Sequence, residues 1–252
     1  MSRWLTGVSA LVLAPVVVYG QFHTTLKPKT TAAFEQYRNQ VEASLTGKAR
    51  FAQLRAGETK VEPAGSQGSI DVAGGMVHDW VAATVVPNTS AAQVIAVLQD
   101  YAAYKNVYGP EVADSRLIER KDGNRFRVFL KLVKSKILTA VLHSEYDVEY
   151  QDRGAAGWRV ISRSTRMVEV GNQGKELAPG EGHGFLWRLN AYWLIEPRGS
   201  DVYVECRTVS LSRDIPFGAG FVIRPFVTSL PVESLKQTLD QTVRAIRPAK
   251  QP

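Results

Sequence analysis

The feature that most constrains the fold is an amphipathic pattern near the C-terminal end of the sequence. Apolar side chains recur there at helical spacing, about 100° per residue, and share one stripe: Val232, Leu235, Leu239, Val243 and Ile246. Pro231 suits a first helical turn, and Pro248 ends the helix. Such a helix cannot bury its stripe alone. Because the preceding sequence is mostly strand-like, we expect a sheet that curves around one face of this helix.

The strand-like segments follow one another almost without interruption. Residues 77–86 predict a first strand, and Ser90 with Gln93 matches a capping box that opens a short helix. Further strands are predicted at residues 112–119, 125–133, 137–150, 158–170, 185–196 and 202–212. Asp122 and Gly123 form a strong hairpin signal between two of them. This order predicts an α+β fold in which a curved antiparallel sheet of about seven strands wraps around the C-terminal helix.

The first 20 residues have the features of a signal peptide. Arg3 precedes an apolar run at residues 5–18, and Val18, Tyr19 and Gly20 form a possible cleavage site. We therefore expect a secreted or periplasmic protein. The alternative is a protein anchored by an uncleaved N-terminal segment, although the run is shorter than the roughly 20 residues that cross a bilayer.

Residues 21–75 are expected to form an N-terminal helical extension and a linker. A helical pattern that begins near Thr31 places Phe34, Tyr37 and Val41 on one face, which we expect to pack on the main domain. Residues 57–75 are rich in Gly, Ser, Ala, Pro and charge and show no periodicity, so they predict the linker.

The charge and the reactive residues exclude several classes of function. The formal net charge is +7, but Lys and Arg are scattered without the dense blocks that mark a nucleic-acid patch, so we expect no nucleic-acid partner. No two of the four histidines stand at metal-ligand spacing. Cys206 is the only cysteine, and its strand pattern indicates a buried thiol. We predict no metal and no other cofactor.

Three segments carry a resemblance to a known superfamily. They are the strand-Pro-helix opening at residues 80–109, the strand pair at residues 185–197 and 202–216, and the final helix at residues 231–246. In this order they resemble the START-like helix-grip (SRPBCC-type) superfamily, from about Met76 to Arg247. This superfamily includes lipid-transfer domains and polyketide cyclase/dehydrase-type proteins. The resemblance implies a ligand-binding domain at residues 76–248, with a cavity between the sheet and the final helix.

The strand pair supplies most of the candidate ligand-binding residues. One face of residues 185–196 carries Trp187 and Trp193, and the other carries Arg188 and Tyr192. Glu205 and Arg207 share a face of the next strand. If the polar residues Arg188, Tyr192, Glu205 and Arg207 face inward, they form a charged patch in an apolar cup; if they face outward, they form a cross-strand ladder on the wet side. Alternation alone leaves both orientations open.

The remaining candidates come from the final helix and from the loop before it. Leu235 and Leu239 lie on the apolar stripe of the helix. Phe217 and Phe221 belong to a Gly- and Pro-interrupted apolar loop at residues 214–230, which could form a flexible lid or pack as a satellite cluster.

We therefore expect a protein that binds or transports a hydrophobic small molecule or lipid, with possible transient membrane contact. A cyclase/dehydrase-like enzyme acting on a hydrophobic substrate is the alternative, and a non-catalytic protein-interaction module is a further one. An apolar cavity favours carriage, whereas charged residues that converge in the cavity favour catalysis. No catalytic residue is assigned from the sequence.

Overall fold

The computed structural model describes residues 23–135 and 139–215, residues 218, 220 and 224, and residues 227–246; the side chain of Asn172 is not described. The expected signal peptide and the loop residues Phe217 and Phe221 therefore lie outside the described residues. None of the described helices is long and apolar enough to span a membrane.

A nine-stranded antiparallel sheet forms most of the described structure. Its order is β2-β4-β11-β10-β8-β7-β6-β5, and β3 pairs with β4 beside β2. The strands are β2 (Thr59–Pro63), β3 (Ser69–Val72), β4 (Gly75–Val86), β5 (Val112–Arg120), β6 (Arg125–Ser135), β7 (Thr139–Asp152), β8 (Trp158–Glu169), β10 (Arg188–Arg198) and β11 (Asp201–Ser212). A separate small pair joins β1 (Thr24–Thr25) to β9 (Glu181–Gly182).

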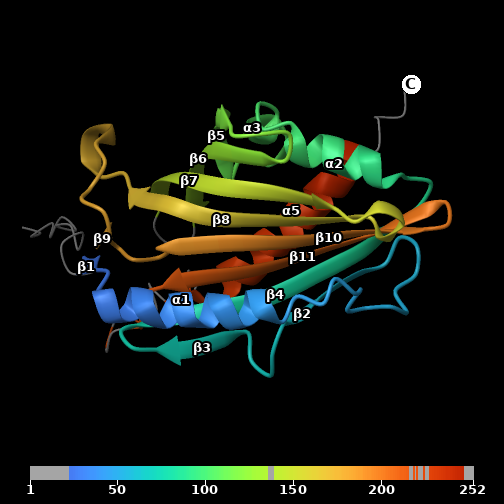
Figure 1. The fold of residues 1–252 in the computed structure, drawn as a ribbon. Coiled ribbons are helices and arrows are strands. Elements are labelled where there is room, and N and C mark those ends of the chain that lie inside the picture. The colour runs from blue at the N-terminus through green and yellow to red at the C-terminus, as the bar shows by residue number, and fades with distance from the viewer. Residues whose placement is uncertain are drawn as a thin grey trace, which may run out of the picture.

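Helices lie on both faces of the sheet (Figure 1). The long helix α5 (Ser229–Ile246) lies behind the sheet in this view, and α1 (Pro28–Ala43) lies in front of it. The short helices α2 (Ala91–Gln99) and α3 (Tyr104–Val107) follow β4. The α+β helix-grip architecture predicted from the sequence is confirmed, because a curved antiparallel sheet holds the C-terminal helix on one face.

The expected turn and cap chemistry is present. The Ser90 side chain accepts a hydrogen bond from the Gln93 backbone, and the Gln93 side chain accepts one from the Ser90 backbone N–H, so the predicted capping box opens α2. Asp122 accepts backbone hydrogen bonds from Asn124 and Arg125 in the turn between β5 and β6. These local bonds satisfy groups that the helix and strand ends leave open.

The expectation of an unstructured linker at residues 57–75 is wrong. Those residues form β2 and β3, which extend the sheet from the seven expected strands to nine by pairing with β4. Both strands are short, and neither alternates cleanly between buried and exposed positions. Their stability comes from pairing with a long buried strand, which their own residue pattern does not reveal.

Apolar cores lie on both faces of the sheet. In the larger core, α2 and α5 pack against one face of the sheet. This core includes Val94, Trp193 and Leu239. A second core joins the other face to α1, through Phe34 and Val41. We call the α5 side the inner face and the α1 side the outer face. Because both faces are covered, a polar residue of a central strand can be buried on either one.

Candidate functional site

A cavity of about 190 Å³ lies between the inner face of the sheet and α5. Its floor follows β6, where Val128, Leu130, Leu132 and Lys134 all line it. These alternate residues extend along roughly 20 Å of the strand at 3.3 Å per residue. Leu235 of α5 lines the opposite wall. The cavity is therefore elongated and mostly apolar, the shape that suits a hydrophobic ligand.

The pairing register places the central floor residues in rows across three strands. Ala191 of β10 lies opposite Ser162 of β8 and Thr208 of β11, and all three line the cavity. Trp193 lies opposite Val160 and Cys206 in the next row, and these three also line it. The small Ala191 side chain lies between two hydroxyl-bearing residues, while the neighbouring row is apolar and filled by an indole ring.

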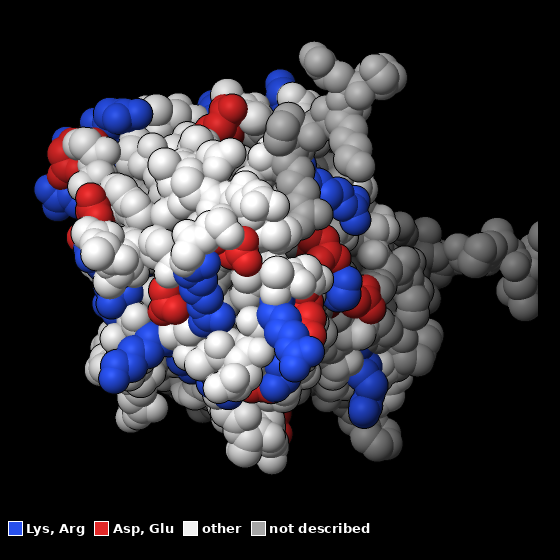
Figure 2. Space-filling view, turned by 90° about the vertical axis from the view of Figure 1, so that its right-hand side faces the viewer, with Lys and Arg blue, Asp and Glu red and all other residues white. Residues whose placement is uncertain are grey.

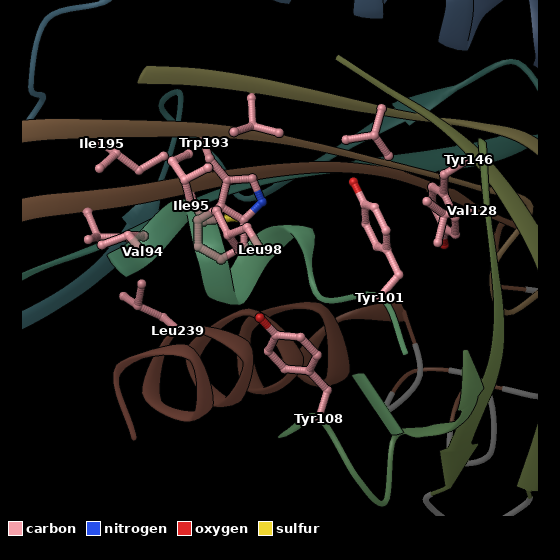
Figure 3. Close-up of a cluster of buried hydrophobic side chains, with 14 of the residues drawn as sticks. Val94, Ile95, Leu98, Tyr101, Tyr108, Val128, Tyr146, Trp193, Ile195 and Leu239 are labelled. Carbon is pink, nitrogen blue, oxygen red and sulfur yellow. The ribbon is translucent and has the colours of Figure 1, made fainter. Parts of the chain in front are cut away.

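Five tyrosines line the cavity, and four of their hydroxyls are bonded within the protein. Tyr101 and Tyr108 project from the segment that follows α2, and Tyr146 projects from β7 (Figure 3). Tyr101 and Tyr150 share a hydrogen bond of 2.9 Å between their hydroxyls, and the Tyr104 and Tyr150 hydroxyls each donate to the Leu98 carbonyl at 2.6 Å. Tyr108 bonds Thr242 of α5. These bonds hold the aromatic wall in place.

The titratable groups in this wall are held in their neutral forms. Burial raises the pKa of Tyr101 and of Tyr146 to about 12 and raises the pKa of Tyr108 still further. Burial likewise raises the pKa of the Cys206 thiol far above its usual range. Since a nucleophile or general base must lose its proton near the working pH, these groups are poorly suited to either role.

The charged residues that line the cavity lie at its Lys134 end and form one connected group. The Lys134 ammonium pairs with the Glu111 carboxylate and donates to the Ser234 hydroxyl at 2.9 Å. Ser234 donates in turn to Glu111 at 3.1 Å. The Lys134 side chain is only 11% exposed, so this mutual pairing compensates for its burial.

Three of the predicted ligand-binding residues lie on the inner side. Trp193 and Leu235 line the cavity. Leu239 is fully buried in the same core and packs behind the lining. Phe217 and Phe221 lie outside the described residues, so their place at the ligand site remains a prediction.

The other predicted residues lie on the outer face and do not line the cavity, which is the outward orientation of the two that alternation left open for Arg188, Tyr192, Glu205 and Arg207. Trp187 packs in the core beneath α1, because the alternation breaks before β10 begins at Arg188. Burial lowers the pKa of Arg188, and the charge of Glu35 on α1 opposes that shift. Trp187 and Arg188 therefore both face the N-terminal helix.

Tyr192, Arg207 and Glu205 also belong to the outer face. The Tyr192 hydroxyl donates to Glu42 of α1 at 3.0 Å, and Arg207 makes two hydrogen bonds to the fully buried Asp79. Glu205 accepts from the Tyr203 hydroxyl and from the backbone N–H of Arg50. The bonds to Glu42 and Arg50 connect the sheet to the N-terminal extension, whose position could not be read from strand alternation.

The outer-face residues line a second pocket of about 280 Å³ beneath residues 44–50. Tyr192, Glu205 and Arg207 line it together with Arg159, whose guanidinium donates to the Leu45 carbonyl. This pocket is polar, and its side chains bond one another or the N-terminal extension. The mostly apolar cavity on the inner face is therefore the better candidate for the functional site.

Sequence reasoning missed the tyrosines and the cavity hydroxyls. Tyr101, Tyr104 and Tyr108 recur at spacings of three and four, and Tyr146 and Tyr150 are four residues apart on one strand, which places each set on a common face. That pattern could have drawn attention to them. Ser162 and Thr208 gave no such signal, because only the register between strands brings them to either side of Ala191.

The sequence matches no model of a known protein family and no curated protein. Solved structures do resemble the fold. The human StarD13 (DLC2) lipid transfer and protein localization domain superposes with a TM-score of 0.50 at 11% identity, over 90% of this chain and 100% of that domain.

Two bacterial structures give similar values. A STAR-related lipid transfer protein from Xanthomonas axonopodis has a TM-score of 0.48 at 18% identity, over 72% of this chain and 100% of that one. The Zhui aromatase/cyclase from Streptomyces sp. R1128 has a TM-score of 0.46 at 14% identity, over 69% and 98%. The likeness to the StarD13 domain and the sheet order show a START-like helix-grip fold, as the sequence predicted. At these identities the likeness concerns the fold.

Proposed function

We propose that this protein binds a hydrophobic small molecule or lipid in the cavity between the sheet and α5, and carries it. The observation that supports this function most directly is the mostly apolar cavity, which Trp193 of the sheet and Leu235 of α5 both line. A cavity of about 150 Å³ lined by apolar side chains is known to hold benzene, so about 190 Å³ accommodates a ligand of at least one ring or a short chain.

Carriage is better supported than cyclase/dehydrase-like catalysis. The charged residues of the lining, Glu111 and Lys134, pair with each other at one end and do not converge on the middle of the cavity. The lining tyrosines and Cys206 stay protonated near neutral pH because burial raises each pKa. No histidine is among the lining residues that the structure describes.

One face of the molecule offers no large electropositive docking surface among its described residues. On the face shown in Figure 2, Lys and Arg side chains are interspersed with Asp and Glu. A transient membrane contact during ligand uptake is part of our proposal and would involve a local apolar surface, because mixed charges attract an anionic bilayer only weakly.

A cavity-filling variant tests this function. Ala191→Phe places a ring in the cavity and should abolish binding of an uncharged fluorescent hydrophobic probe, while Ala113→Phe, at an exposed position of β5, serves as the matched control. Native mass spectrometry of protein purified from its own source should show an added hydrophobic mass in the wild type and none in Ala191→Phe. Equal occupancy in both variants would locate the ligand elsewhere.

A further inference from the structure

Two hydroxyl groups in the floor of the cavity have no partner within the described chain. The side chains of Ser162 and Thr208 line the cavity, and neither hydroxyl makes a hydrogen bond to any described residue. Other hydroxyls nearby behave differently: Ser164, two residues from Ser162, donates toward Asn190 and accepts from the Leu189 backbone. The Ser162 and Thr208 hydroxyls are therefore free to bond what enters the cavity.

The register gives these two hydroxyls a defined arrangement. Ser162 and Thr208 lie directly opposite Ala191 on its two neighbouring strands, so they flank one methyl group from either side. Adjacent strands are about 4.8 Å apart, which leaves a shallow recess over Ala191 with a hydroxyl on each rim. A larger side chain at position 191 would fill that recess.

An independent observation on the lining of the same cavity also indicates an absent polar partner. The Tyr146 hydroxyl is buried, in a residue only 5% exposed, and makes no well-formed hydrogen bond to a described residue, although the Ser144 side chain is near enough to offset part of the rise in its pKa. Ser144, on the same strand, donates its hydrogen to the Leu130 carbonyl at 2.8 Å. Tyr146 pairs with Ser164, two residue pairs from the Val148–Ser162 pair on the β7–β8 ladder. A buried hydroxyl without a partner is costly, and a ligand oxygen would supply one.

The surroundings also define the charge of the group that binds there. None of Tyr146, Ser162, Ala191 and Thr208 is charged, and the pKa of Tyr146 is raised to about 12, so the hydroxyl remains a donor. Lys134 is the cation among the described lining residues. Tyr146 pairs with Val128 of β6, and Lys134 lies six residues, or roughly 20 Å, from Val128 along that strand. It is already paired with Glu111. A carboxylate placed over Ala191 would have no compensating charge.

We infer that the ligand is an uncharged apolar molecule that carries a hydrogen-bonding oxygen, such as a ketone, ester or alcohol. This oxygen sits over Ala191, between the hydroxyls of Ser162 and Thr208. The inference rests on the proposed function, because it names the class of ligand for the same cavity.

A matched set of small ligands tests it. Isothermal titration calorimetry would measure the affinities of 1-tetralone, of the hydrocarbon tetralin and of tetralin carboxylate. The wild type should bind 1-tetralone more tightly than either of the others. In Ser162→Ala/Thr208→Val, the ratio of the affinities for 1-tetralone and tetralin should fall about 3- to 10-fold, the effect of one lost hydrogen bond. Thr165→Val, at an exposed position of β8, should leave the ratio unchanged.

The controls separate this inference from the proposed function. If tetralin and 1-tetralone bind the wild type and the double variant with the same ratio, the cavity binds apolar molecules but the hydroxyl subsite is wrong. Preferred binding of the carboxylate, lost in Lys134→Met, would also overturn it. If no ligand of the set binds, both proposals fail. The double variant should keep the wild-type melting temperature, because it removes hydroxyls without partners; a loss of stability would show that they are bonded within the protein.

Discussion

The hydroxyl of Tyr108 lies 2.9 Å from Oγ1 of Thr242, and this bond connects the end of α3 to the middle of α5. Thr242 is fully buried, and its own hydroxyl hydrogen is donated to the Thr238 carbonyl at 2.8 Å. Tyr108 is therefore the donor of the pair. Because both groups are buried beside the cavity, the bond holds the helix that closes the ligand site against the segment that supplies three of its tyrosines.

We predict that Thr242→Val lowers the free energy of unfolding by about 1–3 kcal/mol, since it leaves the Tyr108 hydroxyl buried without an acceptor. Tyr108→Phe in the Thr242→Val background should recover part of that loss, because no unsatisfied donor then remains. Urea unfolding of the four proteins in this cycle gives the coupling directly. Additive effects of the two substitutions would contradict the bond.

The N-terminal helix should contribute to the stability of the whole domain. Phe34 of α1 is 1% exposed in the outer-face core, so Phe34→Ala should destabilise the protein by about 3–5 kcal/mol. Gln36→Ala, at an exposed position of the same helix, is the control. Thermal unfolding of both variants checks this prediction, and a small effect of Phe34→Ala would mean that α1 is only loosely attached.

The attachment of α1 should weaken in acid. Burial would raise the pKa of Glu42, but hydrogen bonds and charge from Arg163, together with the Tyr192 hydroxyl, outweigh it and lower that pKa. A carboxylate whose pKa is lowered by folding stabilises the protein above its unfolded pKa, about 4.3, and loses that contribution as the pH falls toward the folded value. The stability difference between wild type and Glu42→Gln should therefore be larger at pH 7 than at pH 3. A difference that is constant with pH would exclude this pairing.

Cys206 should be unreactive in the folded protein. Its thiol lines the cavity but is 1% exposed, and burial raises its pKa so that the thiolate is scarce at neutral pH. Iodoacetamide should modify it slowly at pH 8 and rapidly only in denaturant, as followed by intact mass. Rapid modification of the native protein would indicate an activated cysteine and revive a catalytic role.

Export remains a prediction, since residues 1–22 lie outside the described part of the chain. We propose cleavage after Gly20, which would leave Gln21 as the first residue of the mature protein. Intact mass and terminal peptide analysis of the native protein check it. A cytosolic protein that retains Met1 would contradict this prediction.

The sequence determined the elements whose pattern is strong and local. The stripe through Leu235 and Leu239 identified the final helix, Ser90 and Gln93 identified the start of α2, and strand alternation identified the central strands. These features follow from the residue periods of helices and strands and from bonds between near neighbours, so no knowledge of distant contacts was needed. The class of fold followed from their order.

Only the tertiary structure decided which face of each strand is inside and what the cavity contains. Alternation places Trp193 and Tyr192 on opposite faces of the sheet, but the pattern is the same whichever face meets α5. In the structure the face of Trp193 meets α5, and the face of Tyr192 is covered by α1. The strands β2 and β3 exist because β4 pairs with them. Ser162 and Thr208 lie on either side of Ala191 because of the register of three strands that are far apart in sequence. Such relationships depend on long-range packing, which local residue patterns do not encode.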